Sequence, residues 1–186
     1  SKGVITESNN LNPINNYGFS KLIIENYIRL KSNTSLLKYI ILRPSNVFGK
    51  HQRFDRNQGF ISIAISKIYQ EIPIEIWGDG NTVRDYIHIN DVVKILEKLL
   101  SNNVSNETFN LSTGQGRSLL DIIEIIENHI SIKATLNFKS KRNVDVNTVI
   151  LDNSSLLKSI NHEFVDIDKG IKSQIRLIVN KLNNVK

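Results

Sequence analysis

Residues 74–91 read IEIWGDGNTVRDYIHIND, and this segment has a strand signal on each side of a turn signal. Isoleucines alternate with other residues from Ile72 to Ile76, which is typical of a half-buried strand. Residues 78–81, Gly-Asp-Gly-Asn, then predict a turn. Between Arg84 and Ile89 the alternation returns. The segment therefore predicts two short strands joined by a tight turn.

Helix and strand signals are interleaved on both sides of this segment. Asp91 is the predicted N-cap of an apolar helix that reaches Leu100. Upstream, a helical pattern covers 17–31, a buried-strand pattern covers 36–42, and the polar stretch 45–58 predicts a loop. Further helices are predicted at 59–70, 118–130 (opened by a Ser118/Asp121 capping box), 154–159 and 171–182, and further strands at 107–111 and 135–138. Such interleaving is typical of the α/β class.

The composition excludes several classes of protein. The chain has 186 residues, 40% of them hydrophobic, and no cysteine. This length suits one domain or slightly more, and the absence of cysteine excludes disulfide frameworks, cysteine-ligated zinc and thiol catalysis. No apolar run approaches the roughly 18 residues of a bilayer span, and the first twenty residues lack a signal-peptide pattern. We therefore expect a soluble, cytoplasmic protein with no membrane partner and no metal site.

The net charge of +6 permits an anionic partner. A nucleic-acid binder would be expected to cluster its basic residues among aromatic ones. Here the basic residues are scattered, and the densest group is only Lys139, Lys141 and Arg142. We therefore expect no nucleic-acid partner, and the charge suits a smaller anion such as a nucleotide phosphate.

Tyr17 and Lys21 are one helical turn apart, so a phenol and an ammonium share one face of the predicted helix. A neighbouring cation favours the phenolate form of tyrosine, which would let the phenol act as a base near neutral pH. Taken alone, the same spacing also fits an ordinary surface pair.

Three further places carry residues suited to an anionic ligand. Asn46 follows the predicted strand 36–42, and ligands of open α/β sheets bind outside the carboxyl ends of strands. The guanidinium of Arg84 lies near the glycine turn, where it suits a bidentate phosphate contact. Arg142 and Asp145 place a cation three residues from a carboxylate. Each place also has a structural alternative. Asn46 could merely close its own turn, and Arg84 could form an ion pair with Asp85. Arg142 and Asp145 could be a solvated surface pair.

In order and wording, these places resemble the C-terminal portion of the NAD-dependent epimerase/dehydratase family, typified by UDP-glucose 4-epimerase, within the extended short-chain dehydrogenases/reductases. The most specific stretch is 74–91, which is similar to the family signature pIxIxGDGxxxRDYIHVxD. The Tyr17–Lys21 pair, the RPSNVFG run at 43–49 and the FNLSTG run at 109–114 follow in family order. The resemblance covers essentially the whole chain.

The resemblance implies a Rossmann-like doubly wound α/β fold with a small mixed α/β substrate-binding domain. It implies that Tyr17 and Lys21 are catalytic and that Pro44 and Asn46 join them in contacting NAD. The substrate would be a UDP-sugar or a related nucleotide-sugar. The implied substrate-binding residues are Asn46, Gly59, Phe60, Trp77, Arg84, Arg142 and Asp145.

The implied reaction is inversion at sugar C4 by transient NAD-dependent oxidation, in the synthesis of surface-polysaccharide precursors by a homodimer. Two alternatives stay open: a nucleotide-sugar 4,6-dehydratase portion, and a catalytically silent nucleotide-sugar-binding or interface module.

One departure from the family is large, because the chain contains no G-x-x-G-x-x-G phosphate loop. We therefore expect a C-terminal portion of a longer enzyme, in which residues 1–50 are a remnant of the NAD-binding domain. Residues 51–186 would mainly bind the nucleotide-sugar, with 107–130 returning to the Rossmann sheet. Alone, such a portion is expected to bind NAD poorly and to have no measurable activity.

Overall fold

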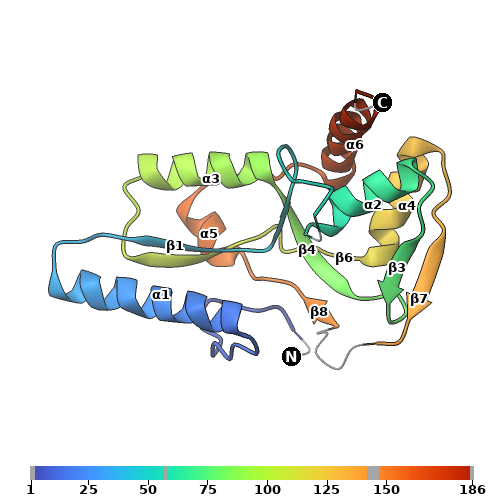
Figure 1. Ribbon diagram of the computed structural model, residues 1–186. Coiled ribbons are helices and arrows are strands. Elements are labelled where there is room, and N and C mark those ends of the chain that lie inside the picture. The colour runs from blue at the N-terminus through green and yellow to red at the C-terminus, as the bar shows by residue number, and fades with distance from the viewer. Residues whose placement is uncertain (1–2, 57, 142–146, 185–186) are drawn as a thin grey trace.

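The computed structural model describes residues 3–56, 58–141 and 147–184. One half of the molecule is a three-layer arrangement (Figure 1). Strand β1 (Ile40–Pro44) pairs in parallel with β5 (Glu107–Leu111). Helix α1 (Asn16–Thr34) lies on one face of this pair, and α3 (Ile89–Ser101) lies on the other with the short helix α5 (Ser154–Ser159).

The two faces of the β1–β5 pair differ in chemistry, because successive strand residues point to opposite faces. Leu42, Phe109 and Leu111 pack with Ile95 and Leu99 of α3 in an apolar cluster. The residues between them meet α1 through polar contacts. Arg43 binds Glu25, and Thr108 accepts a hydrogen bond from Arg29 at 3.0 Å. No described residue of α1 is buried, and Leu22 and Ile28 are half-buried beside Glu25 and Arg29, so polar contacts and partly buried apolar side chains dock this helix together.

The other half of the molecule is built around three packed helices and a second parallel strand pair. Helices α2 (Phe60–Tyr69), α4 (Leu119–Ile130) and α6 (Ile167–Asn183) contact one another and form one large core. Strand β3 (Ile74–Trp77) pairs in parallel with β7 (Leu136–Lys139) at its edge. The fully buried members of this core are mostly isoleucines: Ile61, Ile65, Ile68, Ile76, Ile122, Ile126 and Ile171.

Strand β4 (Val83–His88) connects the two halves, because it pairs with three other strands. It runs parallel to β2 (Asn46–Phe48) and to β8 (Thr148–Val149), and antiparallel to β6 (Gly116–Ser118). The end of β1, the start of α2 and the turn before β4 are thereby held around one region.

The structure confirms the α/β class and most of the predicted elements, including the Ser118/Asp121 capping box of α4. Three short strands were missed, since β2 lies in the predicted loop 45–58 and neither β6 nor β8 was predicted. The prediction for Asp91 was wrong: His88 is the N-cap of α3, and Asp91 lies in its first turn. Its carboxylate is 1% exposed, 3.0 Å from His162 Nε2, and accepts from the Val165 backbone N–H. Within the ranges described above, no helix meets the length and hydropathy expected of a bilayer span.

Candidate functional site

A cleft of about 840 Å³ opens between the two halves of the molecule. It lies at the carboxyl end of β1, which is where ligands bind in open α/β sheets. Its walls come from α1, β2, β3, β4 and the first turns of α2 and α4. Six of the predicted site residues line it: Tyr17, Asn46, Gly59, Phe60, Trp77 and Arg84.

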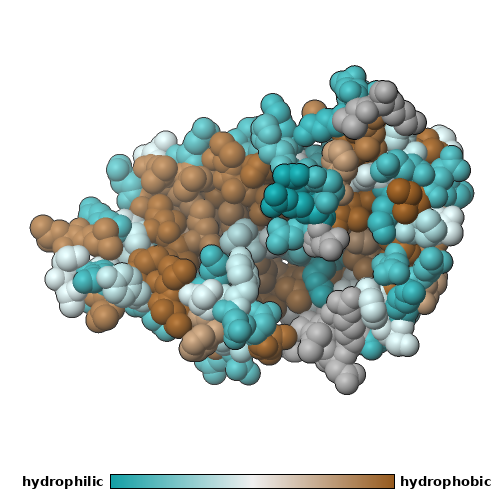
Figure 2. Space-filling model, in the orientation of Figure 1, coloured by the Kyte–Doolittle hydropathy of each residue, from teal (hydrophilic) through white to brown (hydrophobic). Residues whose placement is uncertain are grey.

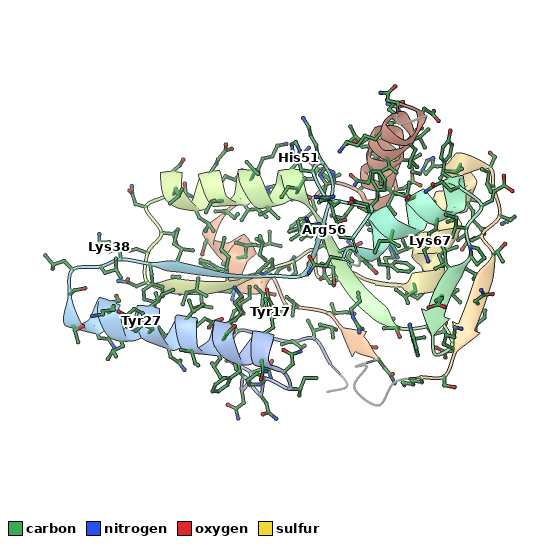
Figure 3. All side chains as sticks on the ribbon, in the orientation of Figure 1. Tyr17, Tyr27, Lys38, His51, Arg56 and Lys67 are labelled. Carbon is green, nitrogen blue, oxygen red and sulfur yellow. The ribbon has the colours of Figure 1, made fainter. Side chains whose placement is uncertain are left out.

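Tyr17 reaches the cleft from the first turn of α1, whose N-cap Asn15 accepts a hydrogen bond from the Gly18 backbone N–H at 2.8 Å. Its side chain is 74% exposed, so the phenol is accessible to a ligand. The Lys21 Nζ lies 5.2 Å from the centroid of the Tyr17 ring, which is a cation–π distance. Figure 3 shows Tyr17 at the end of α1 that lies toward the middle of the molecule, with Tyr27 farther along the helix.

Asn46 and Arg84 lie on adjacent strands and both line the cleft. The Asn46 Nδ2 donates to the Asp85 carbonyl oxygen at 2.8 Å, so the amide is held against β4 rather than closing its own turn. The Arg84 Nη1 donates to the Val83 carbonyl oxygen at 2.8 Å. Pro44 borders an adjoining cavity of about 400 Å³, which Asn46 and Arg84 also line.

A strand paired with β4 carries a second arginine that sequence reasoning missed. Arg117 on β6 is directly opposite Arg84 in the antiparallel register. Like charges in this position destabilise a strand pair. No ion pair within the described ranges involves either arginine, Asp85 included, so the predicted Arg84–Asp85 alternative is not formed.

Asp85 is the second important residue that was missed, and its carboxylate links β4 to the segments that follow β1 and β5 beside the cleft. Its carboxylate is fully buried and accepts hydrogen bonds from Ser45 Oγ, Thr113 N, Thr113 Oγ1 and Gly114 N at 2.9–3.2 Å. Burial raises the pKa of Asp85, while these donors oppose the rise. The available signal was an acidic residue that the alternation places on the same strand face as Ile87 and Ile89, because a buried carboxylate requires donors.

Tyr86 and His88 share the Arg84 face of β4, as the alternation predicts, and both are buried. Burial raises the pKa of Tyr86 to about 12, although the neighbouring Arg84 charge opposes this. The pKa of His88 is lowered by burial, which the Asp91 charge partly offsets. His88 Nδ1 accepts from the Asn90 N–H at 3.3 Å, and its ring packs edge-on against Phe48. These contacts give His88 a structural role, as a strand residue.

Arg142 and Asp145 lie outside the described residues, so their predicted roles have no structural counterpart here. Among the residues that are described, no three His, Cys, Asp or Glu side chains form a group that could hold a metal ion.

A profile of the NAD-dependent epimerase/dehydratase family matches residues 2–112, which is more than half of the chain and includes most of the cleft. The chain belongs to this family. One relative of the chain is a dTDP-4-dehydro-6-deoxyglucose reductase from Escherichia coli, which is 34% identical over 174 residues. That match covers 93% of the present chain and 55% of the reductase.

Other family relatives are epimerases. A UDP-glucose 4-epimerase from Bacillus subtilis is 30% identical over 181 residues, covering 86% of the present chain and 52% of the relative. The crystal structure of a UDP-glucose 4-epimerase from Thermotoga maritima, solved with UDP-glucose, superimposes with a TM-score of 0.89. It is 26% identical, and the match covers 98% of the present chain and 60% of that structure. The present chain thus spans about half the length of the curated relatives it matches.

Proposed function

We propose that this chain is the nucleotide-sugar-binding portion of an NAD-dependent 4-epimerase acting on UDP-hexoses. The observation that supports the proposal most strongly is that Tyr17, Asn46 and Arg84 line one cleft, although they are far apart in the sequence. Nucleotide-sugar epimerases among the family relatives, one solved with UDP-glucose, support the substrate class.

The diphosphate of the ligand is assigned to Arg84. Arginine binds phosphate oxygens through a planar, bidentate arrangement of donors, and Arg84 lacks an ion pair within the described ranges. The opposed Arg117 adds to the positive potential at this strand pair. Arg142 would add a second diphosphate contact, and Asp145 would contact the nucleotide ribose.

The remaining cleft residues would hold the nucleoside and the sugar. Trp77 and the backbone beside it would flank the base, while Gly59 and Phe60 would line the nucleotide. The Asn46 Nδ2 is already committed to Asp85, which orients the amide and leaves its oxygen to accept a hydrogen bond from the ligand. Binding of the remote diphosphate would hold the sugar at Tyr17 while leaving it room to turn.

Tyr17 would act as the acid/base on the sugar 4-hydroxyl. Its phenol is exposed to the cleft, and the Lys21 ammonium lies over its ring, where positive charge favours proton removal from a bound hydroxyl. Lys21 also fits the hydroxyls of a nicotinamide ribose, because its ammonium is exposed on the same helix face; Pro44 and Asn46 lie at the adjoining strand end. NAD, when bound, would supply the acceptor for the hydride that leaves C4.

A second candidate, reduction of a 4-keto nucleotide-sugar, is favoured by the 34% identity to the E. coli reductase. Tyr17 would then donate its proton to the 4-keto oxygen. The two reactions differ in stoichiometry: a reductase consumes one reduced nicotinamide per product, whereas an epimerase consumes none.

Titration calorimetry with UDP and UDP-glucose tests the binding part of the proposal. We expect micromolar binding to the 186-residue chain, weakened about 30-fold in Arg84→Ala, because a hydrogen bond to a charged group contributes about 2 kcal/mol. Arg176→Ala is the matched control, since Arg176 is exposed on α6 outside the cleft. Equal affinities in all three proteins, or no binding by the unmodified chain, would contradict the proposal.

A further inference from the structure

Three polar side chains form a continuous hydrogen-bonded chain from the core of the molecule to the cleft. Gln174 Nε2 on α6 donates to Ser62 Oγ on α2 at 3.0 Å. Ser62 Oγ donates to Gln52 Oε1 at 2.7 Å, and Gln52 Nε2 donates to the Val47 carbonyl oxygen at 2.9 Å. Ser62 is fully buried and Gln174 is 2% exposed, whereas Gln52 lines the cleft. We call these three residues the glutamine–serine relay.

The direction of every hydrogen bond in the relay is determined by its last member. The Val47 carbonyl can only accept, so Gln52 must present its NH₂ there and its oxygen to Ser62. Ser62 therefore donates to Gln52, and its lone pair accepts from the NH₂ of Gln174. This orientation leaves Gln174 Oε1 buried with no hydrogen-bond partner in the part of the chain that the structure describes.

The relay has a feature that stability alone does not explain. A buried acceptor without a donor is costly, and the neighbours of Gln174 on α6 belong to an apolar core, while its side chain borders a small cavity of about 100 Å³ that Gln52 also lines. Each unsatisfied buried group in a native protein calls for an explanation. The other end of the relay, Gln52 at the cleft, suggests an explanation for the unpaired oxygen.

Gln52 fits tightly against the glycine that begins the wall of the cleft. Gly59 has a φ of +87°, and a Cβ added there would lie 2.4 Å from the Gln52 side-chain amide. The backbone at Gly59 therefore lies directly on this amide, and Gly59 is the N-cap of α2. The position of Gln52 thus sets the position of Gly59 and of Phe60, which both line the cleft.

We propose that the glutamine–serine relay is a positioning device that holds Gln52, and through it the Gly59–Phe60 wall, in the geometry that binds the nucleotide-sugar. The inference rests on the proposed function for its ligand. Ser62 and Gln174 touch no ligand themselves, and they act through Gln52.

Ser62→Ala tests the relay, and Ser66→Ala is its matched control. Ser66 is also a buried serine of α2, one helical turn away, but its hydroxyl accepts from Gln70 and is not linked to the cleft. We expect Ser62→Ala to raise the dissociation constant for UDP-glucose about five- to tenfold, the change that loss of one buried hydrogen bond gives. Ser66→Ala should leave it unchanged.

A second variant separates positioning from stability. Gln174→Leu breaks the relay but also removes the unpaired acceptor, so its melting temperature should fall less than that of Ser62→Ala while its affinity falls as much. A loss of affinity that follows the melting temperature across Ser62→Ala, Ser66→Ala and Gln174→Leu would overturn the proposal.

A ligand-independent measurement tests the relay separately from the proposed function. Exchange of the Gln52 side-chain amide protons, followed by NMR, should be slow in the unmodified chain and in Ser66→Ala, and faster in Ser62→Ala. If the unmodified chain binds no UDP-glucose, the proposed function fails, and the exchange measurement alone then tests the relay. Equal exchange rates of the Gln52 amide in the two serine variants would overturn the relay.

Discussion

At the scale of single residues, the buried carboxylate of Asp85 connects segments that border the cleft, although Asp85 does not line the cleft itself. Its carboxylate joins the end of β1, through Ser45, to the loop after β5, through Thr113 and Gly114. Its backbone carbonyl holds Asn46. The backbone of Asp85 thus holds the cleft residue Asn46, while its side chain links β4 to the segments that follow β1 and β5.

Asp85→Ala is expected to lower the free energy of unfolding by about 3 kcal/mol, because several buried donors would lose their acceptor together. Urea unfolding followed by circular dichroism measures the change. Asp79→Ala is the control, since Asp79 is exposed in the turn before β4 and accepts hydrogen bonds only from Asn81 among the described residues. If both variants lost the same stability, Asp85 would not have the organising role described here.

The residue scale also shows what the sequence could not predict. Tyr17, Asn46 and Arg84 were chosen from local pattern and resemblance, and the structure places all three on one cleft, while their roles stay predictions. Arg117 and Asp85 were missed because their importance depends on strand register. Whether two arginines occupy opposite positions on paired strands, or whether donors converge on a carboxylate, is set by pairing between distant segments.

At the scale of elements, α1 differs from the other long helices. Its polar contacts with the β1–β5 pair include the Glu25–Arg43 ion pair at 2.7 Å and the hydrogen bond from Arg29 to Thr108. Helices α2, α4 and α6, by contrast, are joined by buried isoleucines. The helix that carries Tyr17 and Lys21 is therefore the one whose docking depends most on ionised groups.

Docking of α1 should depend on pH. Hydrogen bonds from Arg43 are the largest cause that lowers the pKa of Glu25 from its ordinary value of 4.5, with Arg29 adding to the effect. A lowered pKa means that this carboxylate stabilises the folded state above pH 4.5 and that the stabilisation is lost as the pH falls through the lower folded-state value. The protection factors of the α1 amides, which compare each exchange rate with that of an unfolded peptide at the same pH, should therefore fall below about pH 4.5 before those of α2 do.

Glu25→Gln provides the control for this pH dependence. The amide cannot ionise, so α1 should already exchange faster at pH 7 and should show little further change on acidification. If the amides of α1 and α2 in the unmodified chain lost protection over the same pH range, docking of α1 by the ion pair would be contradicted.

The long elements were predictable because their residues repeat a period, as in α2, α4 and α6. The missed strands β2, β6 and β8 have three, three and two residues, which is too short for any period to appear. They exist because β4 offers them backbone partners. The predicted strand 36–42 begins before β1, which starts at Ile40. Leu36 and Leu37 are apolar, as in a strand, but they are exposed and do not pair with β5.

At the scale of the whole molecule, the half that carries α1, β1 and α3 exposes many hydrophobic side chains, which gather there in Figure 2. On α1 they follow one another at helical spacing: Phe19, Ile23, Tyr27 and Leu30 are each more than half exposed. Patches of this kind mark interaction surfaces. We propose that two copies of the chain associate through this stripe.

Tyr27→Glu is expected to shift the chain from dimer to monomer, because a charge at the centre of the stripe would have to lose its water on association. Light scattering after size-exclusion chromatography measures the mass. Leu36→Glu is the control, because Leu36 is fully exposed just beyond the end of α1 and lies off the stripe. An unmodified chain that is monomeric, or a Tyr27 variant that stays dimeric, would contradict this arrangement.

The central position of β4 has a consequence for how the chain acquires its structure. Its partners β2, β6 and β8 lie in separate parts of the chain, and none of them is the strand directly before or after β4, so each pairing requires a long loop to close before its hydrogen bonds form. Chains dominated by such non-local pairing fold slowly. The helical core can collapse early, whereas the cleft requires the pairing of β2 with β4, because Asn46 and Arg84 on these strands both line it. Binding competence should therefore lag behind the recovery of helical signal in a refolding experiment.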